Sequence, residues 1–242
     1  MQRLIVTPSQ FHSGSIQLTA EQQHYLRRVL RLQAGDRFLA LDGQGQQWVA
    51  TLTETAAVAR VMEMPVTLPL TADIILAAAL PKGSGFDEVV RQATELGATK
   101  IWPIVSDRTL LRPSPQKLTR WQRITAEATE QSERPTVPDV CEPRSFDQLL
   151  QMSDTGRANY LCSARHAAPH LLSYLLESDA SVLIATGPEG GWTEMEVEKA
   201  IAAGYQVVSL GRLILRAVTA PLAALTLVNA AQSLRAAAAQ NS

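Results

Sequence analysis

The sequence is poor in cysteine and in net charge, and each shortage excludes a class of protein. Two cysteines among 242 residues, Cys141 and Cys162, cannot build a disulfide framework, so a reducing compartment is expected. The 22 Lys and Arg residues nearly balance the 23 Asp and Glu residues. No long-range electrostatic field therefore draws the chain to nucleic acid, and any such binding needs a local basic cluster.

Long apolar runs are also missing. The longest apolar region, Ala217–Ala231, is interrupted by Pro221 and Asn229 and is shorter than the roughly 20 residues of a membrane-spanning helix. The first apolar stretch, Leu4–Val6, is too short for a secretory signal. We therefore expect a cytoplasmic protein with no membrane partner. Hydrophobic residues make up 46% of the chain, enough for a large core, which excludes disorder over most of its length.

The first 70 residues predict a small β-rich domain. The capping-box spacing of Thr19 and Gln22 predicts a helix over Glu21–Leu32, which Gly35 would end in the left-handed conformation. Short, loosely alternating segments then predict strands, and these are Arg37–Asp42, Gln47–Glu54 and Val58–Met64. Two prolines that flank a short extended segment indicate a stiff connection, which places the domain boundary near Leu70.

From Ala72 onward, compact apolar runs alternate with helical patterns, which predicts an α/β fold with a largely parallel sheet. The runs are Ile74–Leu80, Ile101–Val105, Tyr160–Ser163, Val182–Thr186 and Val207–Leu210. Helices are predicted near Phe86, after Pro115, after Ser145 and after Thr193. A long apolar helix is expected at the end of the chain.

The most informative segment, Gly187–Gly191, joins a predicted buried strand to a capped helix and contains three glycines. Glycine lets a backbone approach a ligand closely and adopt positive φ, which favours ligand binding at the carboxyl end of this strand. A plain strand-to-helix connection is the alternative, although one glycine suffices for most turns. Leu210–Arg216 also follows a strand, so the two segments would line one crevice at the carboxyl edge of the sheet. Lys82–Gly85 is a candidate third wall or phosphate contact.

One face of the predicted helix over 21–32 is basic and is formed by His24, Arg27, Arg28 and Arg31. Val29 falls on the opposite, apolar side together with Leu26 and Leu30. Because the planar guanidinium binds phosphate bidentately, this stripe favours RNA binding, with Arg3 and Arg37 as extensions. An ordinary solvated face is the alternative.

Other polar patterns indicate no site. His166 and His170 are four residues apart, but Pro169 lies between them and no third ligand is evident, so no metal is expected. Glu127 and Glu130 fall opposite the apolar face of their predicted helix, where solvated acids are typical.

Five motifs occur in a fixed order along the chain. They are Arg28–Leu32 with Gly35-Asp36, Ala93–Gly97, Glu130–Ser132 with Arg134, Gly187–Gly191, and Leu210-Gly211 with Ile214–Arg216. In this order, over nearly the whole chain, they resemble the bacterial 16S ribosomal RNA uracil-N3 methyltransferases of the SPOUT superfamily. The resemblance implies a PUA-like RNA-binding β-barrel in residues 1–70 and a SPOUT methyltransferase domain with a trefoil-knotted sheet in residues 71–242. It also implies S-adenosylmethionine as methyl donor, 16S rRNA of the small ribosomal subunit as substrate, and a homodimer.

The resemblance further implies which residues form the site. The cofactor would be bound by Leu161, Thr186, Gly187, Pro188, Glu189, Gly190, Gly191, Leu210, Gly211, Ile214, Leu215 and Arg216. RNA would be bound by Arg3, His24, Arg27, Arg28 and Arg31. Arg216 and Arg3 are the candidate catalytic residues, because a guanidinium stabilises the negative charge that develops on the uracil oxygens when N3 loses its proton. Relatives usually follow Leu-Arg with Thr-Glu-Thr-Ala, whereas Ala217-Val218-Thr219-Ala220 stands here, so no general base is assigned.

The leading hypothesis is thus an S-adenosylmethionine-dependent rRNA methyltransferase, and two alternatives remain. A noncatalytic RNA-binding or ribosome-assembly protein that retains the cofactor pocket would account for Val218. A small-molecule nucleotide enzyme would leave the arginine stripe unexplained. On the last helix, Leu222, Leu225 and Val228 fit a dimer seam, and an intrachain core would have the same pattern.

Overall fold

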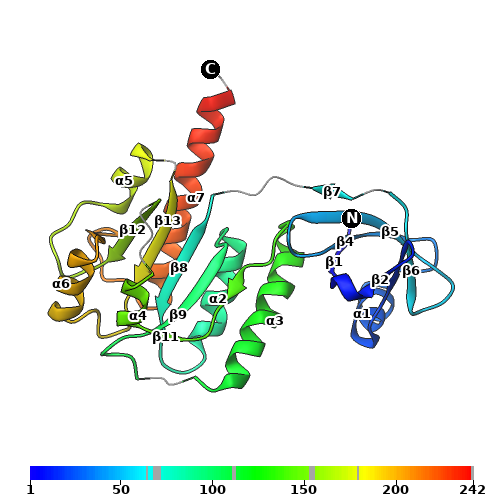
Figure 1. Ribbon diagram of the computed structural model, residues 1–242, viewed down its shortest axis with the longest axis horizontal. Helices are drawn as coiled ribbons and strands as arrows, with labels where there is room; N and C mark the ends of the chain where they lie inside the picture. Colours follow the sequence, from blue (N-terminus) through cyan, green and yellow to red (C-terminus); the bar gives the residue numbers. More distant parts are fainter. Residues whose placement is uncertain (64, 68–71, 111–112, 153–155, 179, 241–242) are drawn as a thin grey trace. The chain divides into compact units, whose positions relative to one another are not determined.

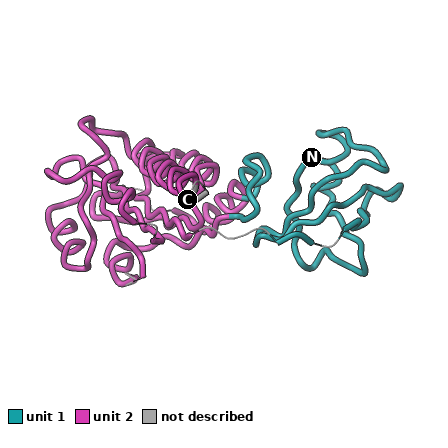
Figure 2. Tube along the Cα trace, turned by 90° about the horizontal axis from the view of Figure 1, so that it is seen from above, with its two compact units in different colours: residues 1–71, 126–137 teal, residues 72–125, 138–242 magenta. Residues whose placement is uncertain are grey.

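The computed structural model describes residues 1–63, 65–67, 72–110, 113–152, 156–178 and 180–240 (Figure 1). The chain forms two compact units, coloured separately in Figure 2. Unit 1 comprises Met1–Thr71 and Ala126–Val137, and unit 2 comprises Ala72–Thr125 and Pro138–Ser242. The boundary expected near Leu70 lies outside the described residues. No sequence pattern indicates that residues 126–137 join unit 1.

Unit 1 is built on a mostly antiparallel sheet with the strand order β1-β4-β5-β6-β3-β2. Its strands are β1 (Arg3–Ile5), β2 (Phe11–His12), β3 (Ser15–Gln17), β4 (Arg37–Leu41), β5 (Gln46–Leu52), β6 (Val58–Val61) and β7 (Val66–Thr67), and a 3₁₀ turn, η1 (Pro8–Gln10), follows β1. The three strands predicted between residues 37 and 64 are present as β4, β5 and β6. Within the connection predicted between Pro65 and Pro69, residues 66–67 pair with β5 as β7, and residues 68–69 lie outside the described residues.

The helix predicted over Glu21–Leu32 forms as two shorter parts. α1 (Ala20–His24) begins at the expected capping box, in which the Thr19 hydroxyl accepts a hydrogen bond from the Gln22 backbone N–H at 3.2 Å. The chain then continues as a π-helical segment, η2 (Tyr25–Val29). A π-helix closes its hydrogen bonds over five residues instead of four, so side chains beyond residue 24 leave the spacing of an α-helix.

The end of this helical region also differs from the prediction. Arg31 takes the left-handed conformation next to the helix, with φ of 58°, and Gly35 has the positive φ expected of it, 92°, but lies beyond the helix end. The Leu32 N–H donates to the Leu26 carbonyl at 3.0 Å and closes the end of the helical region. Val29, expected on the buried side, is 56% exposed as a result of the changed register.

Unit 2 contains a sheet in which every described strand pair is parallel, in the order β10-β9-β8-β13-β12-β14 with β11 beside β9. The strands are β8 (Ile74–Ala79), β9 (Lys100–Val105), β10 (Asp139–Val140), β11 (Arg144–Ser145), β12 (Arg157–Cys162), β13 (Ser181–Thr186) and β14 (Gln206–Val208). The predicted α/β class with a mainly parallel sheet is confirmed. The trefoil knot stays a prediction.

Helices cover both faces of this sheet (Figure 1). One face packs against α2 (Gly85–Glu95), α3 (Pro115–Gln131), α5 (Leu171–Glu177) and α7 (Thr219–Gln240), and the other against α4 (Phe146–Leu150) and α6 (Glu194–Ala202). The predicted caps at Ser145 and Thr193 are present. Leu225 and Val228 of α7 lie in the core of their own chain, so the dimer-seam interpretation is wrong for these two residues. Among the helices described, none combines the length and the apolar character that crossing a bilayer demands.

The carboxyl-terminal end of α3 packs within unit 1 through Glu130. The Ile5 backbone N–H donates to Glu130 Oε1 at 2.6 Å. Burial nevertheless raises the pKa of Glu130 to about 7, and the nearby charge of Glu127 adds to the rise. The expectation that both acids are solvated is therefore wrong for Glu130, because this side of the helix contacts β1.

Candidate functional site

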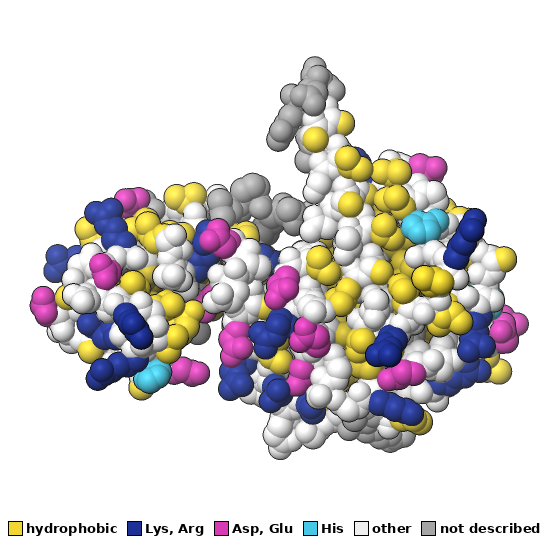
Figure 3. All heavy atoms as spheres, turned by 180° about the vertical axis from the view of Figure 1, so that it is seen from behind, with side chains coloured by type: hydrophobic (Ala, Val, Ile, Leu, Met, Phe, Trp, Pro, Cys, Tyr) yellow, Lys and Arg dark blue, Asp and Glu magenta, His cyan; other side chains and the backbone are white. Residues whose placement is uncertain are grey.

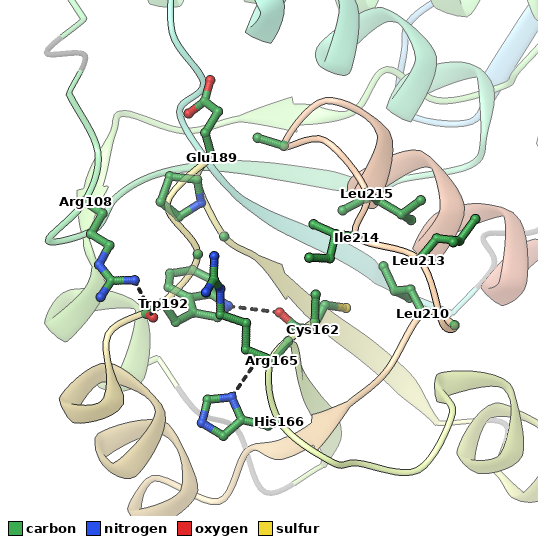
Figure 4. A pocket seen from close by; sticks show the side chains of 18 of the residues that line it. Arg108, Cys162, Arg165, His166, Glu189, Trp192, Leu210, Leu213, Ile214 and Leu215 are labelled. Carbon is green, nitrogen blue, oxygen red and sulfur yellow. Dashed lines mark hydrogen bonds between the residues drawn. The ribbon is translucent and has the colours of Figure 1, made fainter.

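A cleft opens at the carboxyl ends of the adjacent strands β13, β12 and β14 (Figure 4). Its walls come from Cys162–His166 after β12, from residues within 187–194 after β13, and from residues within 210–220 after β14. Parallel strands end at one edge of their sheet, and open α/β sheets hold ligands outside that edge. The fold thus brings together the two glycine-bearing segments that were expected to share a crevice.

The third wall differs from the sequence-based candidate. Of the described lining residues, none comes from Lys82–Gly85. Instead the Lys82 N–H donates to Glu189 Oε1 at 2.9 Å and supports the glycine-rich segment from outside the cleft. Cys162–His166 forms the third wall because β12 lies between β13 and β14. That order depends on nonlocal strand pairing, which no local sequence pattern reveals.

Two glycines of the cleft leave open space where a side chain would begin. Gly191 has φ of +69° and Gly211 has φ of +125°, and among the described residues no atom lies within 4 Å of a Cβ placed on either. The Gly191 N–H donates to the Pro188 carbonyl at 2.8 Å, which closes a tight turn. The backbone is therefore accessible to a ligand at two opposite walls of the cleft.

Trp192 forms a floor beneath the glycine-rich segment. Its indole N–H donates to the Cys162 carbonyl at 3.0 Å, drawn as a dashed line in Figure 4, and the residue is only 6% exposed. Phe146 of α4 packs on the indole with the ring centroids 4.9 Å apart. A Cβ on Gly187 would lie 3.2 Å from the ring, so this glycine lets the backbone cross the indole closely. Trp192 was not predicted, although its position directly after the glycines was a usable signal.

Arg108, from the segment after β9, holds the glycine-rich segment in place. Its guanidinium donates to the carbonyls of Gly190 at 2.7 Å and Trp192 at 3.2 Å. A Cβ on Gly190 would lie 3.1 Å from Arg108 Cδ, so this glycine accommodates the arginine rather than a ligand. Glu196, which is 3% exposed, accepts a hydrogen bond from the Asp107 N–H at 3.0 Å and joins the same segment to α6. The cleft is therefore pre-organised before any ligand binds.

A hydrogen-bonded chain of three polar side chains runs along one wall of the cleft. Ser163 Oγ lies 2.8 Å from His166 Nδ1, and His166 Nε2 lies 3.1 Å from Glu194 Oε2. Ser163 and His166 are half-buried, whereas Glu194 is exposed. His170 takes no part, because its Nδ1 accepts a hydrogen bond from the Leu172 N–H at the start of α5. Both imidazole nitrogens of His166 are thus engaged by side chains of the cleft.

Cys162 lines the cleft but is unsuited to nucleophilic catalysis. Burial raises the pKa of its thiol to about 12, so the thiol stays protonated near neutral pH. In the described part of the chain, no group of three or more His, Cys, Asp or Glu side chains is arranged to hold a metal ion. The groups that the cleft presents are backbone amides, a hydroxyl, an imidazole, carboxylates and guanidinium groups.

Most of the predicted cofactor residues line this cleft. They are Gly187, Pro188, Glu189, Gly191, Leu210, Gly211, Ile214 and Leu215. Leu161 and Thr186 are buried at the ends of β12 and β13, and Gly190 faces Arg108. Arg216 is exposed, and its carbonyl accepts the first amide hydrogen bonds of α7. The roles of these residues stay predictions.

The predicted RNA-binding residues all belong to unit 1, but they do not form one α-helical stripe. Three are exposed, namely His24, Arg28 and Arg31. Arg27 donates from its guanidinium to the Thr53 carbonyl at 2.7 Å. Arg3, also a candidate catalytic residue, forms an ion pair with Glu133 at 2.7 Å. The change to π-helical geometry and the left-handed Arg31 account for the broken spacing.

Known proteins share this organisation. Residues 68–229 match a family described as an RNA methyltransferase domain, and residues 18–59 match an RNA methyltransferase PUA domain. Ribosomal RNA small subunit methyltransferase E of Synechocystis sp. is 49% identical over 235 residues, which cover 94% of this chain and 77% of the relative. The Bacillus subtilis protein of the same name is 32% identical over 88% of each chain. The crystal structure of a ribosomal RNA small subunit methyltransferase E from Neisseria gonorrhoeae, bound to S-adenosyl methionine, is 31% identical. Its TM-score is 0.85, and the match covers 97% of this chain and 98% of that one.

Proposed function

The chain belongs to the RNA methyltransferase family, and we propose that it transfers the methyl group of S-adenosylmethionine to N3 of a uridine in 16S ribosomal RNA. The observation that carries the proposal is the cleft formed by Gly187–Gly191 and Leu210–Leu215 at the carboxyl ends of neighbouring parallel strands. Its relatives are named for action on the same RNA, the ribosomal RNA of the small subunit.

The residues of the cleft suit this donor. When bound, S-adenosylmethionine supplies an electrophilic methyl group on a positively charged sulfur. The open positions at Gly191 and Gly211 admit a ligand close to the backbone, and the apolar lining suits a purine ring; it includes Leu210, Ile214 and Leu215. The carboxylates of Glu189 and Glu194 line the cleft and favour a cationic ligand. Leu161, Thr186 and Arg216 complete the proposed binding set, and Gly190, also predicted there, supports it by making room for Arg108.

Methylation at N3 needs stabilisation of the negative charge that develops on the uracil oxygens. We assign this role to Arg216, which lies between the lining residues Leu215 and Ala217. Its side chain is exposed and has no hydrogen-bond partner within the described part of the chain. Arg3 is the second proposed catalytic guanidinium, and it must exchange its ion pair with Glu133 for a contact with RNA.

We propose different functions for the two parts of the chain. We assign residues 1–70 to RNA binding and residues 71–242 to methyl transfer. His24, Arg28 and Arg31 present exposed cationic or polar side chains on one short segment of unit 1, where arginine can bind phosphate oxygens bidentately. Arg27 joins this surface while its guanidinium also holds the Thr53 carbonyl. Because ribosomal RNA is the substrate, the activity belongs to the cytoplasm.

We also propose that the protein acts as a homodimer. Leu213 and Ile214, both lining the cleft, are 79% and 76% exposed. Figure 3 shows hydrophobic side chains gathered on a face of unit 2 alongside α7. A second copy would bury such a face symmetrically, with roughly 1.5–3 kcal/mol for each large apolar side chain that is fully buried. Sedimentation analysis of the wild type and of Ile214→Glu tests this proposal, and a wild-type monomer at micromolar concentration would contradict it.

Small ribosomal subunits from a strain that lacks the gene separate the enzyme from a noncatalytic RNA-binding or assembly protein. Purified protein and labelled S-adenosylmethionine are expected to transfer label to 16S rRNA, and nucleoside mass spectrometry is expected to identify N3-methyluridine. Binding of S-adenosylhomocysteine and RNA without transfer would support the noncatalytic protein. Label on another atom would overturn the N3 assignment.

A further inference from the structure

We propose that Ser163, His166 and Glu194 form a proton relay that accepts the N3 proton of the uridine during methyl transfer. This inference rests on the function proposed above, since methylation at N3 requires the loss of that proton. Val218 offers no alternative, because its side chain is apolar and packs away from the lining of the cleft. A Cβ on Gly85 would lie 2.9 Å from Val218 Cγ1.

The geometry of the three side chains matches the requirement for a relay. The distances of 2.8 Å from Ser163 Oγ to His166 Nδ1 and 3.1 Å from His166 Nε2 to Glu194 Oε2 both lie within hydrogen-bond range. All three residues line the cleft, and Figure 4 shows the His166 ring on the wall below Trp192 with its Nδ1 bond drawn. The chain of bonds therefore leads from the ligand space to an exposed carboxylate.

The carboxylate fixes the direction of proton transfer. An ionised Glu194 only accepts hydrogen bonds, so it selects the imidazole tautomer that carries its proton on Nε2. His166 Nδ1 then accepts the hydrogen bond from the Ser163 hydroxyl, and the remaining lone pairs of Ser163 Oγ are available to a ligand. This is the logic of a serine–histidine–acid triad with the two imidazole nitrogens exchanged.

In the proposed step, N3 gives its proton to Ser163 Oγ while the Ser163 hydroxyl proton moves to His166 Nδ1. The electron pair of the former N–H bond forms the bond from N3 to the methyl carbon. The electron pair of the carbon–sulfur bond leaves with sulfur, which yields S-adenosylhomocysteine. The imidazolium keeps its Nε2–H bond to Glu194, and the exposure of this carboxylate lets the extra proton pass to water.

The charged groups around the relay favour this direction. Arg165 belongs to the same segment as His166 and lines the cleft. The charged side chains of Arg108 and Glu189 line it as well. Arg108 is bonded to two carbonyls and Glu189 to the Lys82 N–H, whereas Arg165 has no bonded partner among the described residues. Its positive charge favours the uridine anion that forms as N3 loses its proton.

Kinetics of the full chain test the relay against matched controls. His166→Gln keeps a polar side chain that cannot take up a proton, so kcat is expected to fall about 100-fold, while the KM for S-adenosylmethionine changes by less than about threefold. Ser163→Ala is expected to match this loss. Glu194→Gln is expected to lower kcat about 10-fold, because His166 can still take up the proton but is less well oriented. Two controls should keep wild-type kcat: His12→Gln, an exposed histidine of β2, and Glu198→Gln, an exposed acid one turn along α6.

The pH dependence of kcat distinguishes a relay from a structural role. A histidine that accepts protons is active only in its neutral form, so the activity of the wild type is expected to fall at acid pH. His166→Gln is expected to lack this acid limb. Calorimetric affinity for S-adenosylhomocysteine should be unchanged in the variant, which excludes collapse of the cleft.

Nitrogen-15 NMR of the ligand-free protein tests the relay without any activity measurement. His166, identified by the signals lost in His166→Gln, is expected to carry its neutral-state proton on Nε2. A proton on Nδ1 instead, or a His166→Gln variant with wild-type kcat and acid limb, would overturn the relay. A wild-type protein that transfers no methyl group to RNA would overturn the proposed function itself, so the two failures are distinguishable.

Discussion

The sheets of the two units differ in pairing, and their functional residues are positioned differently as a result. In unit 2 the strands that end at the cleft are parallel and covered on both faces, so strand order alone places three segments at one edge. In unit 1 most strand pairs are antiparallel. Its exposed basic side chains lie in or directly after a short helical region that changes from α to π geometry after His24. The cleft therefore depends on topology, whereas the basic surface depends on local backbone geometry.

The largest difference between the two units is expected for substitution of Trp192, the floor of the cleft in unit 2. Trp192→Ala removes a buried indole, its bond to Cys162 and its contact with Gly187. We expect a loss of about 3–5 kcal/mol in the free energy of unfolding, together with loss of S-adenosylhomocysteine binding. Trp48→Ala in unit 1, where the half-buried ring packs on Phe11, should leave that affinity unchanged. Urea unfolding and calorimetry measure both effects, and equal losses of affinity would contradict the separation of the units.

A smaller effect is expected where unit 2 orients its glycine-rich segment. Arg108→Met frees two carbonyls, so the affinity for S-adenosylhomocysteine should fall about 10-fold, equal to about 1.4 kcal/mol. Gly190→Val should cause a similar loss, because its side chain displaces Arg108. The control Arg120→Met breaks a different ion pair, with Asp87, and should not change the affinity.

The losses of affinity expected for these two substitutions have the same cause, which is loss of the Arg108 contacts. A double-mutant cycle tests this. The Arg108→Met, Gly190→Val double variant should bind S-adenosylhomocysteine about as well as either single variant. Fully additive losses, measured by calorimetry, would show that Gly190 contacts the ligand independently of Arg108.

In unit 1 the expected effect concerns RNA and its salt dependence. Arg28→Gln and Arg31→Gln should each reduce the slope of log K against log salt by about 0.7–0.9, one phosphate contact each. Arg27→Gln should in addition lower the free energy of unfolding by about 0.5–1.5 kcal/mol, because its bond to the Thr53 carbonyl is lost. Fluorescence anisotropy over a salt series measures the slopes. Unchanged slopes for Arg28 and Arg31 would identify them as ordinary solvated residues.

A further effect is the pH dependence of stability contributed by Glu130. Its pKa is raised from 4.5 to about 7, so between these values the folded protein binds more protons than the unfolded chain. Stability from this group therefore falls as pH rises from about 4.5 to about 7 and changes little above that range. Glu130→Gln keeps an acceptor for the Ile5 N–H and should remove this slope in urea unfolding. If the free energy of unfolding of the variant and of the wild type changed equally with pH, Glu130 would not be the source of this slope.

The sequence predicted most of the secondary structure of unit 2 because its signals are local. Apolar runs buried on both faces gave β8, β9 and β13 to within one or two residues, and the capping residues Ser145 and Thr193 marked helix starts. The glycine-rich wall of the cleft was predictable for the same reason. Its other components, Arg108 and Cys162–His166, come from distant segments, and only the pairing of β12 between β13 and β14 brings the latter into place.

Unit 1 was less predictable because two of its features compete with local preference. A non-glycine residue rarely adopts positive φ, yet Arg31 does so to complete the helix end. Residues 126–137 continue a helix that begins in unit 2 but pack with β1 through Glu130. The first feature depends on local backbone geometry and the second on a tertiary contact, and spacing and composition record neither.

The most direct test of the cleft as the methyl-donor site is a crystal structure of this chain with S-adenosylhomocysteine. The ligand is expected between the backbone of Gly191 and that of Gly211, above Trp192. Ligand density away from both glycines, or a space between them filled by the protein's own side chains, would contradict the account.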